Sequence, residues 1–170
     1  MAHSLILGMT ESGKTTLAKK LAQNYRARGI KVLVLDPMGD PEWNADYQTS
    51  DVDEFLDVFW NSRQCAVFID EAGEAVGQFD KVMHRTATKG RHWGHSCHYL
   101  SQRGAQIART VRDQCSHLFL FTTALDDSKI HANEWNKPPL RTANTLPQGH
   151  YFHATRFGDL DRGQLWGDEN

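Results

Sequence analysis

The stretch LILGMTESGKTTLAKKLA, from Leu5 to Ala22, constrains the fold of this chain more than any other part of the sequence. An apolar run that ends at Gly8 is followed by a loop with a second glycine, and apolar residues then recur at helical spacing until Gly29. A strand, a tight loop and an amphipathic helix therefore follow one another. The stretch predicts the first half of a β-α unit, in which the helix packs back onto the sheet that holds the strand.

The same alternation of strand and helix continues along the chain. Further strands are expected where aliphatic and β-branched residues run together, at 30–37, 65–70, 96–102 and 117–123. Helices are expected where apolar residues recur every three or four positions, at 51–60, 79–89 and 105–115. Ser50 is the expected N-cap of the helix at 51–60, because a serine hydroxyl can accept a hydrogen bond from a free amide of the first turn.

The sequence pattern near the end of the chain differs from the strand and helix alternation before it. Residues 147–167 carry apolar side chains in alternation around glycines, which predicts a C-terminal β-hairpin. The repeated β-α order before it predicts an α/β fold with a mostly parallel sheet flanked by helices. A chain of 170 residues with 39% hydrophobic content is large enough for one core and too small for two, so residues 1–170 are expected to form a single domain.

Charge and cysteine content narrow the class of protein. The net charge of −2 gives no bulk attraction to nucleic acid, so any DNA contact must come from a local patch or from an assembly. The three cysteines lack CxxC spacing, which favours free thiols in a reducing compartment. No apolar run approaches the roughly 20 residues of a membrane span, and the start of the chain lacks the pattern of a signal peptide. A cytoplasmic protein without a membrane segment is expected.

The loop at Gly8 to Thr15 matches the pattern G-x-x-x-x-G-K-[ST], with a strand before it and a helix after it. Its glycines let main-chain N–H groups point inward, and the start of the helix directs free N–H groups and the positive end of its dipole to the same place, where a phosphate is favoured. Lys14 would reach the β- and γ-phosphates of a nucleoside triphosphate, and the Thr15 hydroxyl would contact Mg²⁺. The expected fold is therefore that of a P-loop NTPase. The residues expected to bind the nucleotide are Gly8, Met9, Thr10, Glu11, Ser12, Gly13, Lys14, Thr15 and Thr16.

A second motif bears on hydrolysis. The strand AVFID ends in Asp70 and is followed by Glu71, so two carboxylates leave the carboxyl end of a buried strand. Asp70 is suited to hold Mg²⁺, and Glu71 to take a proton from an attacking water. An acid pair alone is equally well explained as the start of a solvated loop. Together with the phosphate loop, however, it predicts an ATPase that uses ATP and Mg²⁺.

Gln102 follows the strand expected at 96–102, next to the strands that carry the other two motifs. An amide at that place could hold the attacking water or sense the γ-phosphate, so Gln102 joins Lys14 and Glu71 as a candidate catalytic residue. The alternative is that Ser101 and Gln102 simply open a loop and cap the next helix.

Three segments in this order, GMTESGKT, VFIDEAGE and TKGRHWGHSCHYLSQR, resemble the FtsK/HerA superfamily of P-loop motor ATPases. The short form of the chain is similar to the genome-packaging ATPases of viruses and phages within that superfamily. The resemblance spans about residues 5–123 and implies the nucleotide, magnesium and catalytic roles given above. It also implies a homo-oligomeric ring that moves double-stranded DNA, a capsid or portal component as partner, and a place in the host cytoplasm or with the virion.

A ring of this kind uses an arginine of one subunit at the nucleotide of the next. We take Arg91 and Arg112 as the candidates for this trans-acting arginine. They are chosen from the arginines in the corresponding half of the chain, which are Arg85, Arg91, Arg103, Arg109 and Arg112.

Two other functions remain open on the sequence. A small-molecule or nucleoside kinase would need an acceptor pocket and an arginine-rich lid, and no such lid is evident. A nucleotide-switched assembly ATPase would hydrolyse slowly without moving DNA. Adenine is the expected base, because NKPP at 136–139 lacks the aspartate of a guanine-specific element.

The histidines offer a further alternative. His92, His95 and His98 recur every three residues, as ligands of a metal could. Gly94 interrupts the helical pattern there and the last histidine belongs to a strand, so the imidazoles need not converge. We favour a modest basic edge formed by Lys89, Arg91 and His92, which in a ring would line a channel with positive charge for DNA. An ordinary solvated helix end is the other interpretation.

Overall fold

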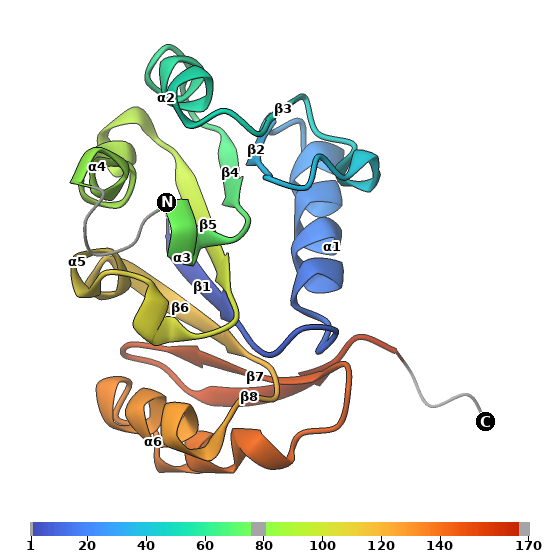
Figure 1. The fold of residues 1–170 in the computed structure, drawn as a ribbon, viewed down its shortest axis with the longest axis vertical. Helices are drawn as coiled ribbons and strands as arrows, with labels where there is room; N and C mark the ends of the chain where they lie inside the picture. Colours follow the sequence, from blue (N-terminus) through green and yellow to red (C-terminus); the bar gives the residue numbers. More distant parts are fainter. Residues whose placement is uncertain (1, 76–80, 167–170) are drawn as a thin grey trace.

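An eight-stranded sheet organises residues 2–75 and 81–166, the part of the chain that the computed structural model describes (Figure 1). Its strands lie in the order β3-β2-β4-β5-β1-β6-β7-β8. The strands from β3 to β6 in this order run parallel, whereas β7 and β8 are added antiparallel at one edge. The α/β fold with a mostly parallel sheet and a C-terminal hairpin is therefore confirmed.

Short strands alternate with helices along the chain. The strands are β1 (His3–Leu7), β2 (Val32–Leu35), β3 (Tyr47–Thr49), β4 (Ala66–Ile69), β5 (Ser96–Ser101), β6 (Cys115–Leu120), β7 (His150–Thr155) and β8 (Leu160–Gln164). The α-helices are α1 (Lys14–Ala27), α2 (Val52–Trp60), α3 (Ala72–Ala75), α4 (Lys81–Lys89), α5 (Arg109–Asp113) and α6 (Leu125–Glu134). Short 3₁₀-helices are formed by Pro41–Trp43, Gly90–Trp93, Gly104–Gln106 and Pro138–Thr145.

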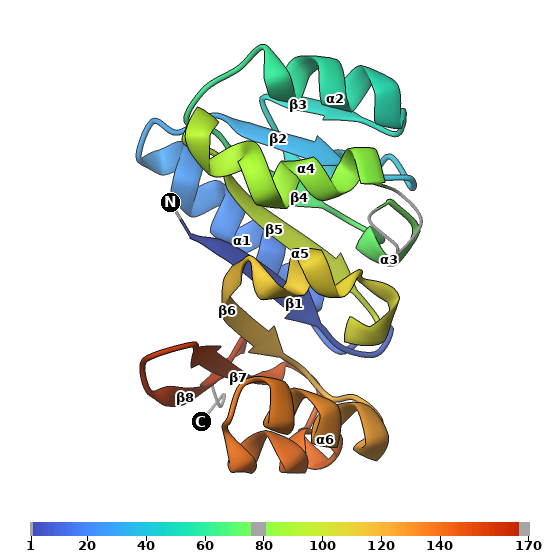
Figure 2. The same cartoon turned by 90° about the vertical axis from the view of Figure 1, so that its left-hand side faces the viewer.

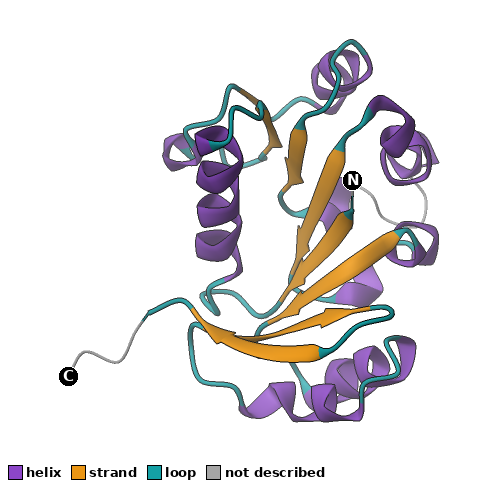
Figure 3. Ribbon diagram, turned by 180° about the vertical axis from the view of Figure 1, so that it is seen from behind, coloured by secondary structure: helices purple, strands orange, loops and turns teal. Residues whose placement is uncertain are grey.

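The helices cover both faces of the sheet, because successive residues of a strand point to opposite sides. On one face α1 buries Leu17 and Ala18 against a core that includes Ile6. Leu5 and Leu7 of the same strand belong to the larger core on the other face, to which α2, α4, α5 and α6 contribute. Figures 1 and 3 show α1 on one side of the sheet and these four helices on the other, and Figure 2 shows them from the side.

The N-cap expected at Ser50 is wrong by one residue. Asp51 caps α2, and its carboxylate accepts a hydrogen bond of 2.8 Å from the main-chain amide of Glu54. The Thr49 hydroxyl accepts from the Asp51 amide at 3.1 Å, which fixes the bend between β3 and the helix. Ser50 lies in that bend, so its position precedes the cap.

The sequence analysis missed several elements and made others too long. Strand β3 lies in a stretch, 38–50, that was expected to be a loop, and no element was predicted for the stretches that form helix α6 and the 3₁₀-helix Pro138–Thr145. The helix expected at 105–115 is shorter, because Gly104–Gln106 forms a 3₁₀ turn and Cys115 already begins β6. The helix expected at 79–89 is found as α4, and its first two residues lie outside the described part of the chain.

The hairpin extends the sheet of its own subunit. β7 pairs antiparallel with β6 through the register Leu118 to Ala154, and β8 pairs antiparallel with β7. This pairing covers the edge of β6, and the last strand carries polar residues such as Arg162 outward.

The three cysteines lie inside the fold. Cys65, Cys97 and Cys115 are free and buried, and burial raises the pKa of Cys97 to about 12. They act as small core residues. Among the helices of residues 2–75 and 81–166, none combines the length and the apolar character needed to cross a membrane.

Two buried histidines join strands to helices as neutral groups. The Nδ1 atom of His3 accepts from the Cys97 amide at 2.9 Å, so its Nε2–H donates to the Ala87 carbonyl oxygen at 3.1 Å. His95 is held in the same way, between the Cys65 amide at 3.2 Å and the Phe59 carbonyl oxygen at 2.8 Å. Burial lowers the pKa of His3 to about 4 and lowers that of His95. Protonation of Nδ1 would set one N–H against another.

The buried histidines predict a loss of stability in acid. His3 binds a proton near pH 6.5 in the unfolded chain but only near pH 4 in the folded protein. The contribution of neutral His3 to the free energy of unfolding is therefore fully present above pH 6.5 and is lost as the pH falls toward 4. We expect His3 alone to account for about 2 kcal/mol of lost unfolding free energy between pH 7.5 and pH 5.

Urea unfolding of the parent and of His3→Gln at both pH values tests this. Glutamine keeps one donor and one acceptor but does not titrate, so the variant should lose about 2 kcal/mol less over this range. His92→Gln, at an exposed histidine, is the control and should behave as the parent. Equal pH dependence in all three proteins would contradict the assignment.

Candidate functional site

The sequence motifs meet at one edge of the sheet, where its parallel strands end. β5 lies between β4 and β1, so the loop after β1, the acids after β4 and Gln102 after β5 leave three adjacent strands. The placement of Gln102 between the other two motifs follows the expectation from its position at a strand end. Carboxyl ends of parallel strands are the usual place for ligands in α/β folds.

The loop after β1 is anchored to the strands on both sides. The Gly8 amide donates to the Ser101 carbonyl oxygen at 3.3 Å, and the Met9 amide donates to the Thr122 carbonyl oxygen at 2.9 Å. A Cβ atom on Gly8 would lie 2.6 Å from Ser12 Oγ, closer than real contacts allow. A glycine at this position therefore lets the loop fold tightly onto itself.

The loop presents unpaired amides at the start of α1. Its main-chain hydrogen bonds leave the amides of Gly13, Lys14 and Thr15 without an acceptor among the described residues. The buried Ser12 hydroxyl also lacks a partner there. Gly13 has a left-handed backbone with φ of 117°, which turns the chain into the helix. Free amides at a helix N-terminus fit a phosphate group.

Lys14 and the two acids share one charged site. The ammonium of Lys14 is buried, and burial lowers its pKa, while the carboxylates of Glu71 and then Asp70 raise it. Burial is also the main reason that the pKa of Asp70 rises to about 6, with the charges of Asp36 and Glu71 acting in the same direction. The three groups predicted from the sequence are thus close enough to interact. They fit a magnesium-bound triphosphate, whose metal and phosphates would balance these charges.

The acid pair sits on a constrained backbone. Glu71 has a φ of 51°, a left-handed conformation that costs energy for a residue with a side chain, and its amide donates to Asp70 Oδ1 at 2.9 Å. Helix α3 begins at the next residue, and a Cβ atom on Gly73 would lie 2.7 Å from Cβ of Gln106. Close packing against the segment after β5 therefore fixes the acids beside the loop.

Asp36 is a site residue that the sequence analysis missed. Leu35 pairs with Ile69 in the sheet, so Asp36 and Asp70 leave neighbouring strands side by side. The Asp36 carboxylate is buried and accepts from the amides of Met38 at 2.8 Å and residue 40 at 2.9 Å. Its place after the apolar run 30–35, like that of Asp70 after its own strand, was the signal that could have found it. It shapes the loop that borders the acids.

Gln102 contacts the phosphate loop. Its Nε2 donates to the Thr10 hydroxyl at 2.8 Å, although the side chain is exposed. The next residue, Arg103, pairs in bidentate fashion with the buried carboxylate of Asp127, at 3.0 and 3.1 Å. These side chains line a cavity of about 530 Å³ on the β6 side of the loop.

The two candidate trans-acting arginines both have partners in their own subunit. Arg91 is exposed and donates to the Gln114 carbonyl oxygen. Arg112 donates to the Gly104 carbonyl oxygen at 2.9 Å and pairs with Glu134 at 3.1 Å, with 13% of its side chain exposed. Arg112 thus braces α5 against α6, and a role in a neighbouring site would require these contacts to break.

The histidines of the alternative metal site point to different partners. His95 bridges the main chain of Phe59 and Cys65, whereas His98 contacts the Ser4 hydroxyl at 2.5 Å and the Tyr25 hydroxyl at 3.1 Å. Within residues 2–75 and 81–166, no three His, Cys, Asp or Glu side chains are grouped so as to hold a metal ion.

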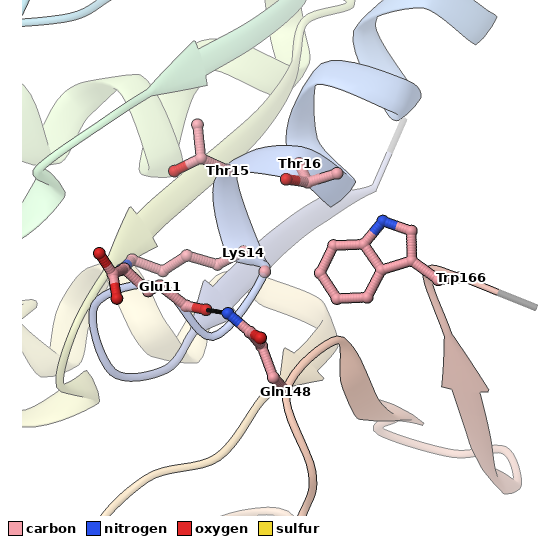
Figure 4. Close-up of a pocket in the computed structure, with 7 residues that line it drawn as sticks. Glu11, Lys14, Thr15, Thr16, Gln148 and Trp166 are labelled. Carbon is pink, nitrogen blue, oxygen red and sulfur yellow. Dashed lines mark hydrogen bonds between the residues drawn. The ribbon is translucent and has the colours of Figure 1, made fainter.

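The C-terminal hairpin closes the other side of the loop. Gln148 Nε2 donates to the Glu11 carbonyl oxygen at 2.8 Å, and the Gly149 amide donates to the Ser12 carbonyl oxygen at 2.9 Å. Figure 4 shows the first of these bonds and the indole of Trp166 beside the start of α1. A cavity of about 270 Å³ lies here, lined by Glu11, Gly13, Lys14, Thr15, Thr16, Gln148 and Trp166. Gln148 and Trp166 were not found from the sequence.

Known proteins share this arrangement. Residues 1–68 match the family model of the central domain of the helicase HerA. No curated protein matches the sequence. Among solved structures, the genome packaging NTPase B204 of Sulfolobus turreted icosahedral virus 2, in complex with AMPPCP, is similar over 96% of both chains, with a TM-score of 0.82 and 17% identity.

Two further solved structures are also similar. VirB4 of Thermoanaerobacter pseudethanolicus is matched over 98% of this chain and 90% of its own, with a TM-score of 0.74 and 10% identity. The pCW3 conjugation coupling protein TcpA, in a monomer form with ATPγS, is matched over 96% of this chain and 59% of its own, with a TM-score of 0.74 and 16% identity.

The sheet order and the loop define a P-loop NTPase fold. Within that class, the match of residues 1–68 to the HerA family model supports the resemblance to the FtsK/HerA superfamily, and the similar structures share the fold. The resemblance expected from the sequence is thereby confirmed.

The backbone of Gly13 gives a test of the loop geometry. A Cβ atom there would lie 2.7 Å from Leu165 Cδ1 and 3.0 Å from Phe121 Cε1, in addition to the strain of a positive φ. We expect Gly13→Ala to lower the unfolding free energy by about 2–4 kcal/mol. Gly29 is a matched control, because it also has a positive φ but has nothing near its missing side chain.

Gly29→Ala should therefore cost only about 1 kcal/mol. Urea unfolding of both variants and the parent measures the difference. Equal losses in the two variants would show that the hairpin does not press on the loop.

Proposed function

We propose that this chain hydrolyses ATP with Mg²⁺ and that hydrolysis drives the movement of double-stranded DNA, in the packaging of a viral genome. The observation that carries the proposal is the convergence of the free loop amides, Lys14 and the acid pair at one sheet edge. This combination offers sites for the phosphates, for a metal and for an attacking water.

Each residue has a role that its surroundings support. The loop from Gly8 to Thr16 holds the phosphate tail of ATP, and Lys14 places its buried charge on the β- and γ-phosphates. Thr15 and Asp70 hold Mg²⁺, which when bound supplies positive charge that stabilises the developing charge on the phosphate oxygens. Glu71 accepts a proton from the attacking water.

Gln102 senses the γ-phosphate or holds the water. Its bond to Thr10 supports this role, since it keeps the amide against the phosphate loop. Loss of that amide would remove this contact and leave the bond from the Gly8 amide to the Ser101 carbonyl oxygen between the phosphate loop and β5. The trans-acting arginine is proposed to be Arg91 or Arg112, and Arg91 is the more accessible of the two.

DNA movement rests on similar proteins and on local charge. B204 is named as a genome packaging NTPase and TcpA as a conjugation coupling protein. Structures of B204 are described in complex with AMPPCP, AMP and ATPγS, which supports ATP as the nucleotide here. The chain has a net charge of only −2, so a DNA path needs a local basic surface.

Helix α4 and the turn after it provide such a surface. Arg85, Lys89, Arg91 and His92 are exposed there. They precede β5, at the end of the sheet opposite to the nucleotide site. Repeated in a homo-oligomeric ring, they would give a continuous basic lining. A capsid or portal component would then receive the DNA, in the host cytoplasm or with the virion.

Hydrolysis is tested with two substitutions. Lys14→Ala removes the only positively charged side chain of the loop, so kcat/KM for MgATP should fall by about 100-fold or more. Glu71→Gln should lower kcat by about 100-fold or more while MgATP binding is kept, because only proton acceptance is lost. Lys129→Ala, at an exposed lysine of α6, is the control. Parent-like turnover by Lys14→Ala would overturn the site assignment.

DNA coupling is tested by measuring ATPase rates with and without double-stranded DNA. We expect DNA to stimulate the parent, and the Arg85→Glu/Lys89→Glu double variant to lose most of that stimulation. Lys129→Glu reverses one positive charge away from the basic surface, half the charge change of the double variant, and should keep the stimulation. A rate that DNA leaves unchanged would favour an assembly ATPase, and phosphate transfer to a nucleoside would favour a kinase.

A further inference from the structure

The indole of Trp166 is held beside the phosphate loop rather than in a core. About half of this side chain, 52%, is exposed, whereas Trp43 and Trp135 are almost fully buried. Its six-membered ring lies against Gly149, where a Cβ atom would come within 2.3 and 2.4 Å of two ring carbons. Gly149 also has a left-handed φ of 81°. The absence of a side chain at 149 thus makes room for the indole.

Hydrogen bonds of Leu165 and Gly149, the neighbours of this indole, connect it to the loop and to α1. The Leu165 amide donates to the Gly149 carbonyl oxygen at 2.9 Å, and the Gly149 amide donates to the Ser12 carbonyl oxygen at 2.9 Å. Lys20 of α1 donates to the Leu165 carbonyl oxygen at 2.9 Å. The residue before Trp166 is therefore held by Gly149 and by α1, and Gly149, against which the indole lies, is held by the phosphate loop.

The cavity beside Trp166 lies where the rest of a nucleotide must go. The free amides of Gly13, Lys14 and Thr15 define where the phosphates bind, and the cavity continues from them along Thr16 to the indole (Figure 4). A sugar and base attached to that phosphate tail need a space that opens from the loop. Trp166 is the one aromatic residue that lines this cavity among the described residues.

On the basis of the proposed function, we propose that Trp166 is the stacking platform for the base of the bound nucleoside triphosphate. An aromatic ring held at fixed distance from a phosphate site can stack on a base through its π face. The half-exposed indole has an apolar surface that a base would cover. Its packing against Gly149 and the bonds of the preceding residue, Leu165, to Gly149 and Lys20 mean that the platform exists before the nucleotide arrives, which lowers the entropy lost on binding.

Inorganic tripolyphosphate separates this role from a structural one. It carries the phosphates of ATP but no base, so it reports the loop without the platform. If Trp166 stacks on the base, its removal affects ATP and leaves tripolyphosphate alone. If Trp166 only supports the loop, both ligands lose affinity together.

Calorimetric titration of MgATP and of magnesium tripolyphosphate tests the proposal. Trp166→Ala should weaken MgATP binding by about 10- to 100-fold and change tripolyphosphate binding by less than about twofold. Trp166→Phe keeps a smaller ring and should stay within about fivefold of the parent for both ligands. Phe157→Ala removes a fully exposed aromatic from the turn of the same hairpin and is the matched control. Thermal unfolding confirms that each variant is folded.

The possible outcomes distinguish a failure of the base-stacking role of Trp166 from a failure of the proposed function. Unchanged MgATP affinity in Trp166→Ala, or equal losses for both ligands, would overturn the platform while the proposed function stands. A parent that binds neither ligand would refute the proposed function, and the platform with it.

Discussion

The attachment of one loop to two strand ends is the constraint on which the rest of this structure depends. Hydrogen bonds from Gly8 to Ser101 of β5 and from Met9 to Thr122, just after β6, hold the main chain in a tight curve as it leaves β1. That curve directs the first amides of α1 to a single point and leaves them without partners among the residues that the structure describes. Because β5 lies between β1 and β4, the same anchoring brings the acids after β4 and Gln102 to that point. The strand order of the sheet and the anchored loop therefore form the site together.

Burying the charged side chains of this site costs free energy. Asp70 is 9% exposed, and burial is the main reason that its pKa rises to about 6. Asp36 and Glu71 add negative charge, and the single buried lysine of the loop opposes it. Glu71 also keeps a left-handed backbone. A protein selected only for stability would avoid such a cluster, so its presence fits a site made for a metal and phosphates.

Site residues could be predicted from the sequence where their roles depend on residues near them in the chain. The loop from Gly8 to Thr15 and the acids Asp70 and Glu71 were found because their chemistry depends on near neighbours in the chain. The N-cap of α2 was predicted one residue too early, at Ser50, because the chain bends there after Thr49 and Asp51 caps the helix. Gln148 could not be found, since it lies 137 residues from its partner Glu11 and meets it only because β7 adds to β6. Trp166 escaped for the same reason.

The central claim is that the free amides at the start of α1 bind the phosphate tail of a nucleoside triphosphate. Amide NMR spectra of the Glu71→Gln variant, titrated with MgATP, test it most directly, because that variant keeps the loop and slows hydrolysis. The account predicts large shifts of the Gly13, Lys14 and Thr15 amide resonances and slower hydrogen exchange at these three amides. Unchanged resonances at saturating MgATP would contradict it.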